Sequence, residues 1–167
     1  HGTSRRQRQM CIRDRLITGG GTGIGRAIAI LFADNGANVT ITGRRSNVLE
    51  EVADNSSNIS AFQMDVSNEK EVISVISKAV SQFGPIQVCV ANAGIAEGKK
   101  LQNTDLEFWQ KIMGTNLDGT FLTIRESMKS MLKADWGRVI AISSIAGIKG
   151  LKGCLLYTSP SPRDFVR

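Results

Sequence analysis

The glycine-rich run TGGGTGIG at residues 18–25 constrains the fold of this chain more than any other feature. It follows a short apolar segment at residues 16–18 and opens a stretch at residues 24–35 in which apolar side chains recur at helical spacing: Ile24, Ile28, Leu31 and Phe32. Such a loop lets a pyrophosphate approach the backbone closely and rest on the helix N-terminus, where free N–H groups favour negative charge. Because glycines also serve tight turns, the run alone is a modest signal. It predicts a strand, a phosphate-binding loop and a helix.

Strand and helix patterns alternate along the rest of the chain. Apolar or β-branched runs predict further strands at residues 39–42, 59–64, 86–91 and 138–142. Helical patterns lie between them, with Ser67 as an expected N-cap, Thr104 with Glu107 as a capping box, and helices at residues 47–54 and 121–133. Five strands separated by helices predict an α/β fold, a doubly wound parallel sheet with helices on both faces (Rossmann-type), truncated after the fifth strand.

The charge of the chain is unevenly distributed. The net charge is +6, but residues 1–15 and 154–167 together hold seven of the 21 basic and two of the 15 acidic residues, so residues 16–153 carry only +1. A basic footprint confined to a short arm is weak evidence for nucleic-acid binding. No apolar run approaches the length that crosses a bilayer. We therefore expect neither a nucleic-acid partner nor a membrane span.

Cysteine usage excludes a disulfide or metal framework. Two of the three cysteines, Cys11 and Cys154, lie in the end segments, and only Cys89 lies in the core, inside an apolar run. A buried thiol in a reducing compartment is the interpretation of Cys89. No metal site is expected, and a cytoplasmic location is the default.

Both ends resemble translated sequencing adapters of the transposase type. RRQRQMCIRD at residues 5–14 and CLLYTSPSPRD at residues 154–164 each match an in-frame adapter translation. The alternative is a natural basic arm and a Pro/Ser tail. Because both ends match, we expect residues 1–15 and 154–167 to be non-native. Foreign segments are excluded from fold reasoning. Residues 16–153 would then be an incomplete, amino-terminal part of a dinucleotide-binding domain.

Five motifs in order resemble the short-chain dehydrogenase/reductase family across residues 16–153. The glycine loop has the spacing TGxxxGxG, through Gly19, Gly23 and Gly25, rather than the general GxGxxG. ANAG at residues 91–94 follows the fourth strand, and Asp65-Val66 ends the third. Asn116 lies in GTNLDGTF, and Ser144 ends RVIAISS. Each has an ordinary alternative as a turn, a cap or a strand-end hydroxyl, but their order and spacing together make coincidence untenable.

The resemblance implies roles for these residues. The cofactor would contact the glycine loop, the end of the third strand and the loop after the fourth, that is Gly19, Gly23, Ile24, Gly25, Asp65, Val66, Asn92, Ala93 and Gly94. Asn92 would brace the centre of the sheet. Asn116 would support a proton relay and Ser144 would orient the reacting carbonyl, while the cofactor carries the hydride. The helix at residues 121–133 corresponds to an oligomer surface in this family, so a homo-oligomer is implied.

The end of the second strand favours NADP as the cofactor. An NAD enzyme places an acid there to accept hydrogen bonds from the ribose 2′-hydroxyl. This chain has Gly43-Arg44-Arg45 instead. A guanidinium matches a 2′-phosphate in geometry and charge. Arg44 and Arg45 are therefore candidate cofactor-binding residues, with Arg44 the better one.

The catalytic tyrosine and lysine of the family are only partly matched. Tyr157 lies thirteen positions after Ser144, where the resemblance implies the catalytic tyrosine, but Ser161 occupies the position of the lysine. Pro160 and Pro162 disfavour the expected helix, and Tyr157 lies inside the adapter-like segment. We therefore interpret its placement as coincidence and expect this 167-residue chain to lack measurable dehydrogenase activity.

The parent protein is predicted to be an NADP-dependent oxidoreductase acting on a small carbonyl or alcohol substrate. The loop TGGGTGIG and the GRR turn look most like carbonyl-reducing family members, including 3-oxoacyl thioester reductases. The alternative is a non-catalytic NADP-binding regulator on the same fold. The retention of Asn116 and Ser144 argues against that alternative.

Overall fold

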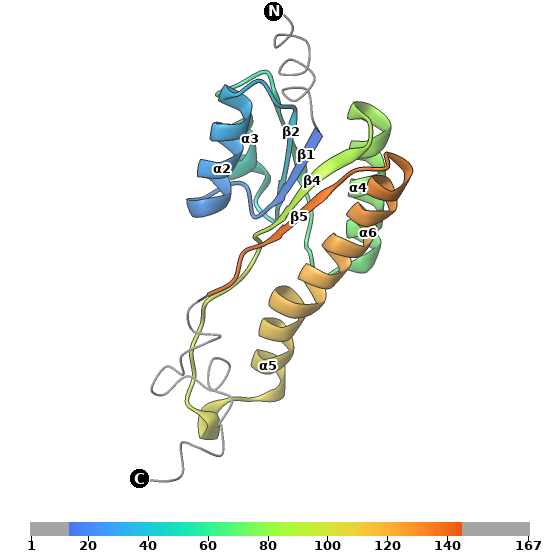
Figure 1. Cartoon of the computed structure of the whole chain (residues 1–167). Coiled ribbons are helices and arrows are strands. Elements are labelled where there is room, and N and C mark those ends of the chain that lie inside the picture. The colour runs from blue at the N-terminus through green and yellow to red at the C-terminus, as the bar shows by residue number, and fades with distance from the viewer. Residues whose placement is uncertain (1–13, 145–167) are drawn as a thin grey trace, which may run out of the picture.

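The structure, a computed structural model, describes residues 14–144 as a parallel sheet with helices on both faces (Figure 1). The strands are β1 (Asp14–Thr18), β2 (Val39–Gly43), β3 (Ile59–Gln63), β4 (Ile86–Ala91) and β5 (Arg138–Ala141). The helices are α2 (Gly23–Asp34), α3 (Ser46–Ala53), α4 (Glu69–Phe83), the 3₁₀ turn η1 (Leu101–Asn103), α5 (Leu106–Met113), the π-helical turn η2 (Gly114–Asp118) and α6 (Gly119–Lys133). The predicted α/β fold is confirmed.

The strand order β3-β2-β1-β4-β5 places β1 at the centre of the sheet, and every pairing is parallel. The chain moves outward from β1 to β3 on one side and then crosses over to β4 on the other. The loops after β1 and β4 therefore diverge at the carboxyl ends of neighbouring strands. In open parallel sheets, this reversal point is where ligands bind.

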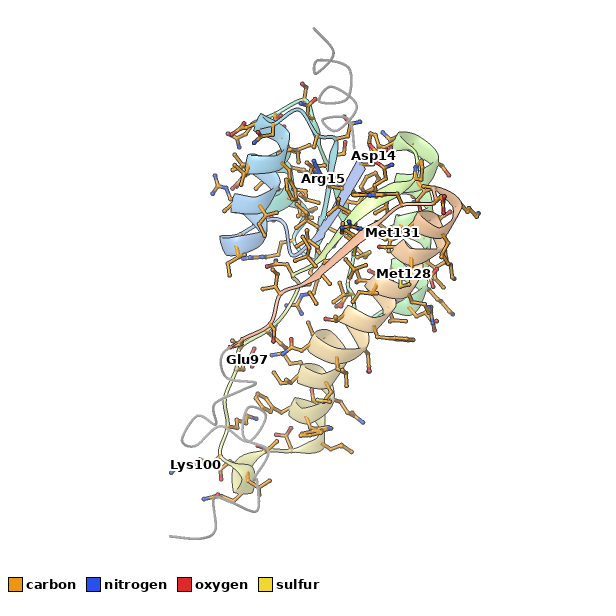
Figure 2. The ribbon with its side chains drawn as sticks, viewed as in Figure 1. Asp14, Arg15, Glu97, Lys100, Met128 and Met131 are labelled. Atoms are coloured by element: carbon orange, nitrogen blue, oxygen red, sulfur yellow. The ribbon has the colours of Figure 1, made fainter. Side chains whose placement is uncertain are left out.

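The first strand is longer than the sequence predicted. It begins at Asp14 rather than Leu16, because the Arg15 amide donates to the Asn38 carbonyl at 2.9 Å and both residues pair with the neighbouring strands. The Arg15 guanidinium lies 4.2 Å from the centre of the Phe32 ring. Figure 2 shows Asp14 and Arg15 at one end of the molecule and Glu97 and Lys100 at the other, where the segment after β4 extends beyond the sheet.

Two hydrophobic clusters lie on opposite faces of the sheet. Consecutive residues of a strand point to opposite faces, so Leu16 packs under α4 and α6 while Ile17 packs under α2 and α3. Cys89 is fully buried in the first of these clusters, as expected. Burial raises the pKa of its thiol to about 11, against a smaller lowering by a hydrogen bond with Ser127. Cys89 is therefore a core residue and no nucleophile at neutral pH.

The apolar repeat of α2 is only partly buried, and the predicted N-caps of two other helices are wrong. In α2 the fully buried residues are Gly25, Ala29 and Ala33; Ile28 and Phe32 pack against the core, whereas Ile24 and Leu31 are each 61% exposed. Small side chains let this helix lie close to the sheet. The N-caps of α4 and α5 are Asn68 and Asp105, each one residue after the predicted Ser67 and Thr104. In both cases the hydroxyl of the predicted cap donates elsewhere, Ser67 to Asp65 and Thr104 to the Lys100 carbonyl, and the next residue accepts from the N2 or N3 amide.

One long helix crosses the second face of the sheet. The segments α5, η2 and α6 follow each other without a break, and Figure 1 shows them as one rod beside α4. The helix predicted to begin at residue 121 is therefore the continuation of an earlier helix, because α5 and the π-helical turn η2 precede it directly. No helix among residues 14–144 is long and apolar enough to cross a membrane.

Candidate cofactor and active site

The glycine loop after β1 folds tightly against the sheet. Gly19 and Gly23 have φ angles of +67° and +53°, which side chains other than glycine rarely adopt. The Gly20 amide donates to the Thr42 carbonyl at 3.1 Å. The N-terminus of α2 follows, with no acidic residue in its first turn and no side-chain cap from Thr22. This end of the helix presents backbone N–H groups and a positive dipole to an anion.

Asn92 joins the glycine loop to the loop after β4, so the bracing role implied for it matches the geometry. Its side-chain amide donates to the carbonyls of Thr18 and Gly19 at 2.9 and 3.3 Å. In return, the Thr18 hydroxyl accepts from the backbone amides of Asn92 and Ala93 at 3.1 and 3.0 Å. These bonds fix the two loops that border the cleft at the reversal point of the sheet.

Replacing Thr18 by valine is expected to destabilise the protein by about 2 kcal/mol, because two partly buried backbone N–H groups, those of Asn92 and Ala93, lose their acceptor. Thr42→Val is the matched control. Thr42 is equally buried in the next strand, but its hydroxyl has no hydrogen-bond partner among the described residues. Its replacement is expected to be neutral or stabilising. Urea unfolding of the full-length protein measures both changes, and equal effects would contradict the role assigned to the Thr18 hydroxyl.

A cleft runs from the glycine loop across the carboxyl ends of β1, β2 and β3. It brings together most of the predicted cofactor-binding residues with Gly21, Thr22 and Thr115, namely Gly19, Arg44, Arg45, Asp65, Val66, Ala93 and Gly94. Gly23, Ile24 and Gly25 lie instead in the first turn of α2, and Asn92 lines the adjoining cavity described below. The cleft therefore has the glycine-lined floor and helix N-terminus that a dinucleotide pyrophosphate needs.

The two arginines lie on a fixed turn at the rim of this cleft. The Gln63 side-chain amide donates to the Arg44 carbonyl at 3.0 Å, and the Met64 amide donates to the Gly43 carbonyl at 2.8 Å. Both arginines are exposed, and neither guanidinium forms an ion pair with a carboxylate within the described range. They are thus positioned to receive an anionic group.

Asp65 holds the turn that follows β3. Its Oδ1 accepts from the amide and the hydroxyl of Ser67 at 2.9 and 2.7 Å, and its own amide donates to Glu71 at 2.8 Å. Asp65 therefore both stabilises this turn and lines the cleft. The next residue, Val66, contacts α6, because a Cβ on Gly119 would lie 2.6 Å from the Val66 side chain.

Asn116 links the helix rod to the loop after β4. Its Oδ1 accepts from the Ile95 amide and its Nδ2 donates to the Ile95 carbonyl, both at 2.9 Å. The residue lies in the π-helical turn η2, and the Thr120 hydroxyl donates to its backbone carbonyl at 2.8 Å. Single π-helical turns occur frequently at functional sites. The pair of bonds sets the position of the loop that borders the cofactor cleft.

A second cavity of about 470 Å³ adjoins the first through Ala93, Gly94 and Ile95. Asn116 and Ser144, which are 28 positions apart in the sequence, both line it. Its remaining walls are largely apolar and come from the helix rod, the loop after β4 and the end of β5, including Ile95, Ile112, Met113, Leu117 and Ile142. Tyr157 lies outside the described residues.

Three contributors to the site were missed from the sequence. The Thr18 hydroxyl and the Ile95 backbone act through hydrogen bonds that no motif spacing specifies. Gly20 is needed because a Cβ there would lie 2.6 Å from the Ile41 side chain. Gly20 is the second glycine of the GGG run, and its place in that run was a signal that could have identified it.

The fold and the paired cavities define a dinucleotide-binding α/β protein. Residues 15–160 match the profile of the family described as short chain dehydrogenase, and the chain belongs to this family. The match overlaps the adapter-like segments at Arg15 and at residues 154–160. The boundaries of those segments stay a prediction.

Several oxidoreductases are similar to this chain. It is 36% identical over 149 residues to a 3-oxoacyl-(acyl-carrier-protein) reductase of Synechocystis, covering 86% of this chain and 60% of the relative. It is 32% identical over 146 residues to an uncharacterized oxidoreductase of Staphylococcus aureus, covering 86% and 63%. A crystal structure of actinorhodin polyketide ketoreductase with NADPH matches with a TM-score of 0.84 at 27% identity, covering 87% and 58%. The chain thus spans about three fifths of the length of these proteins.

Proposed function

We propose that the full-length protein is an NADP-dependent oxidoreductase that interconverts a carbonyl and an alcohol. The observation that carries this proposal is the convergence of Asn116 and Ser144 on one cavity that shares Ala93 and Gly94 with the cofactor cleft. A substrate in that cavity would lie beside the end of the cofactor that transfers hydride. The nicotinamide cofactor, when bound, supplies or accepts that hydride.

The residues of this chain would bind and orient the reactants. The α2 N-terminus and the amides of the glycine loop would hold the pyrophosphate. Asn92 and Thr18 would hold the glycine loop and the loop after β4 together. The Ser144 hydroxyl would donate a hydrogen bond to the reacting carbonyl oxygen, and Asn116 would hold the loop at Ile95. By resemblance, a tyrosine at the position of Tyr157 would exchange the proton with that oxygen.

The substrate class we propose is a 3-oxoacyl thioester or a related ketone. The second cavity has apolar walls around two polar side chains, as expected for a ketone attached to a hydrocarbon chain. Relatives named as 3-oxoacyl-(acyl-carrier-protein) reductases and as a polyketide ketoreductase support the same class. Exposed apolar side chains on α6, namely Phe121, Met128 and Leu132, support a homo-oligomer.

The proposal is tested by NADPH oxidation with acetoacetyl-coenzyme A as the substrate and the full-length protein as the enzyme. We expect turnover that depends on both compounds and falls at least about 100-fold in Ser144→Ala, since a donor aimed at a reacting oxygen contributes on that scale. NADP binding without turnover on any ketone tested would instead indicate a non-catalytic NADP-binding regulator.

Arg44→Asp is expected to reverse the cofactor preference. The substitution removes a cation at the cleft rim and places a carboxylate where it repels a 2′-phosphate and accepts from a 2′-hydroxyl. We expect the ratio of kcat/KM for NADPH to that for NADH to fall about 100-fold or more, equivalent to about 3 kcal/mol. Lys78→Asp, the same charge change on the exposed face of α4, should leave the ratio unaltered. A wild-type protein that uses NADH as well as NADPH would contradict the assignment.

A further inference from the structure

A groove between α4 and α6 lies away from both cavities described above. It has a volume of about 460 Å³, within the range of small-molecule sites. It lies along α4 from Ile73 to Ser81 and along the carboxyl-terminal half of α6, and Figure 1 shows the two helices side by side on one face of the sheet. Both helices lead into the starts of the next strands, β4 and β5, whereas the cofactor cleft lies where the strands end. A ligand here would not overlap the cofactor.

The floor of the groove is apolar and its α6 rim is cationic. Ile73, Ile76, Val80 and Pro85 line it from the α4 side. Lys129 and Lys133, four residues apart and thus one turn apart on α6, line it from the other side. Lys133 forms no ion pair within residues 14–144. An apolar floor beside two ammonium groups matches a ligand with a hydrocarbon part and an anionic head.

One carboxylate also lines the groove, and its charge is already compensated. Glu126 is 6% exposed, and its two oxygens accept from Arg125 Nε at 2.7 Å and from Lys129 Nζ at 2.6 Å. Burial raises the pKa of this carboxyl, but the bonds from Lys129 and Arg125 outweigh it, so the net pKa is lowered and Glu126 is ionised at neutral pH. Arg125 also pairs with Glu69 at 2.7 Å. The network therefore fixes Lys129 at the rim and leaves the charge of Lys133 uncompensated.

Ser130 provides an independent indication of a ligand. This residue lines the groove together with the two lysines and is 6% exposed, yet its hydroxyl has no hydrogen-bond partner among the described residues. A buried hydroxyl without a partner is unfavourable. Its O–H can donate to an acceptor placed between Lys129 and Lys133. Three donors within five positions of α6 thus line one side of the groove.

We propose that the α4–α6 groove binds an anionic amphiphile of the fatty-carboxylate class. The carboxylate accepts from the Ser130 hydroxyl and the ammonium groups of Lys129 and Lys133, and the alkyl chain lies along Ile73, Ile76 and Val80. Charge-assisted hydrogen bonds supply the specificity for the head, and burial of the chain supplies most of the affinity. This site is independent of the proposed oxidoreductase function, because it shares no residue with the cofactor cleft or the second cavity.

Decanoate is the probe for this groove, titrated calorimetrically into the full-length protein saturated with NADP and with the ketone substrate. We expect one decanoate site that neither compound displaces. Lys133→Glu should weaken decanoate binding about tenfold or more, and Ser130→Ala several-fold. Lys78→Glu, the same charge change on the exposed face of α4, should leave it unaltered. The NADP affinity should be equal in all variants, which also shows that they fold.

Two further ligands separate the contributions of the anionic head and of the alkyl chain to the affinity. Decanol, which keeps the chain and loses the charge, and acetate, which keeps the charge and loses the chain, should both bind at least about tenfold more weakly than decanoate. The proposal is overturned if decanol or acetate binds as tightly as decanoate, if NADP or substrate displaces decanoate, or if Lys133→Glu binds it like wild type. Displacement would assign the decanoate to the active site instead.

Discussion

Gly25→Ala is expected to abolish NADP binding by the full-length protein. A Cβ at this position would lie 2.3 Å from the Gly19 carbonyl oxygen and 2.6 Å from Asn92 Nδ2. The first contact is with backbone, so no side-chain rotation relieves it, and α2 must move away from the loop that it anchors. Overpacking of this kind costs about 1–3 kcal/mol of stability or more. It also moves the helix N-terminus away from the pyrophosphate position.

We expect the dissociation constant for NADP to rise at least about 100-fold in Gly25→Ala, measured by calorimetry. Gly36→Asn is the matched control. Gly36 follows the other end of α2 with a φ of +77°, is exposed and lines neither cavity, and asparagine tolerates this conformation. Its NADP affinity should be unaltered. Equal losses in the two variants would show that any substitution at an end of α2, and not the contact between Gly25 and Gly19, weakens NADP binding.

The fold could be predicted from the sequence because each strand carried its own signal. The apolar run at residues 86–91 gave β4 its observed bounds, and the helical repeat of Val72, Val75 and Ile76 gave the buried face of α4. The apolar repeat of α2 indicated the helix but only part of its buried face. Ile28 and Phe32 pack against the core, whereas the fully buried positions are the small Ala29 and Ala33, and Ile24 and Leu31 are exposed.

The site was predictable where a motif fixes a residue and not where the backbone makes the contact. Spacing identified Arg44, Asp65, Asn116 and Ser144, which the structure brings to two adjoining cavities. The partner of Asn116 could not be found this way, because any side chain at position 95 offers the same amide and carbonyl. The cap positions Asn68 and Asp105 were missed by one residue, since two suitable capping residues stand next to each other in both places.

Asn116→Ala is expected to reduce kcat about 100-fold and to weaken NADP binding as well. The substitution removes both hydrogen bonds between the helix rod and Ile95, a loss of about 1–3 kcal/mol in total. Those bonds hold the segment that continues from Ala93 and Gly94, which border both the cofactor cleft and the second cavity. A shift of about 1 Å in such a loop misplaces the reactants and can cost about 100-fold in rate.

Two readouts separate loop positioning from a direct role of Asn116 in proton transfer. If Asn116 acts by holding the loop, the dissociation constant for NADP should rise about fivefold to tenfold together with the fall in kcat. If kcat falls while NADP affinity is unchanged, Asn116 acts on the proton relay alone and the positioning argument is wrong. Asn55→Ala removes a similar side-chain bond to a helix carbonyl, that of Glu51 at 2.6 Å, on the exposed end of α3. Asn55→Ala should leave both kcat and the dissociation constant for NADP unaltered, because the C-terminal residues of α3 line neither cavity.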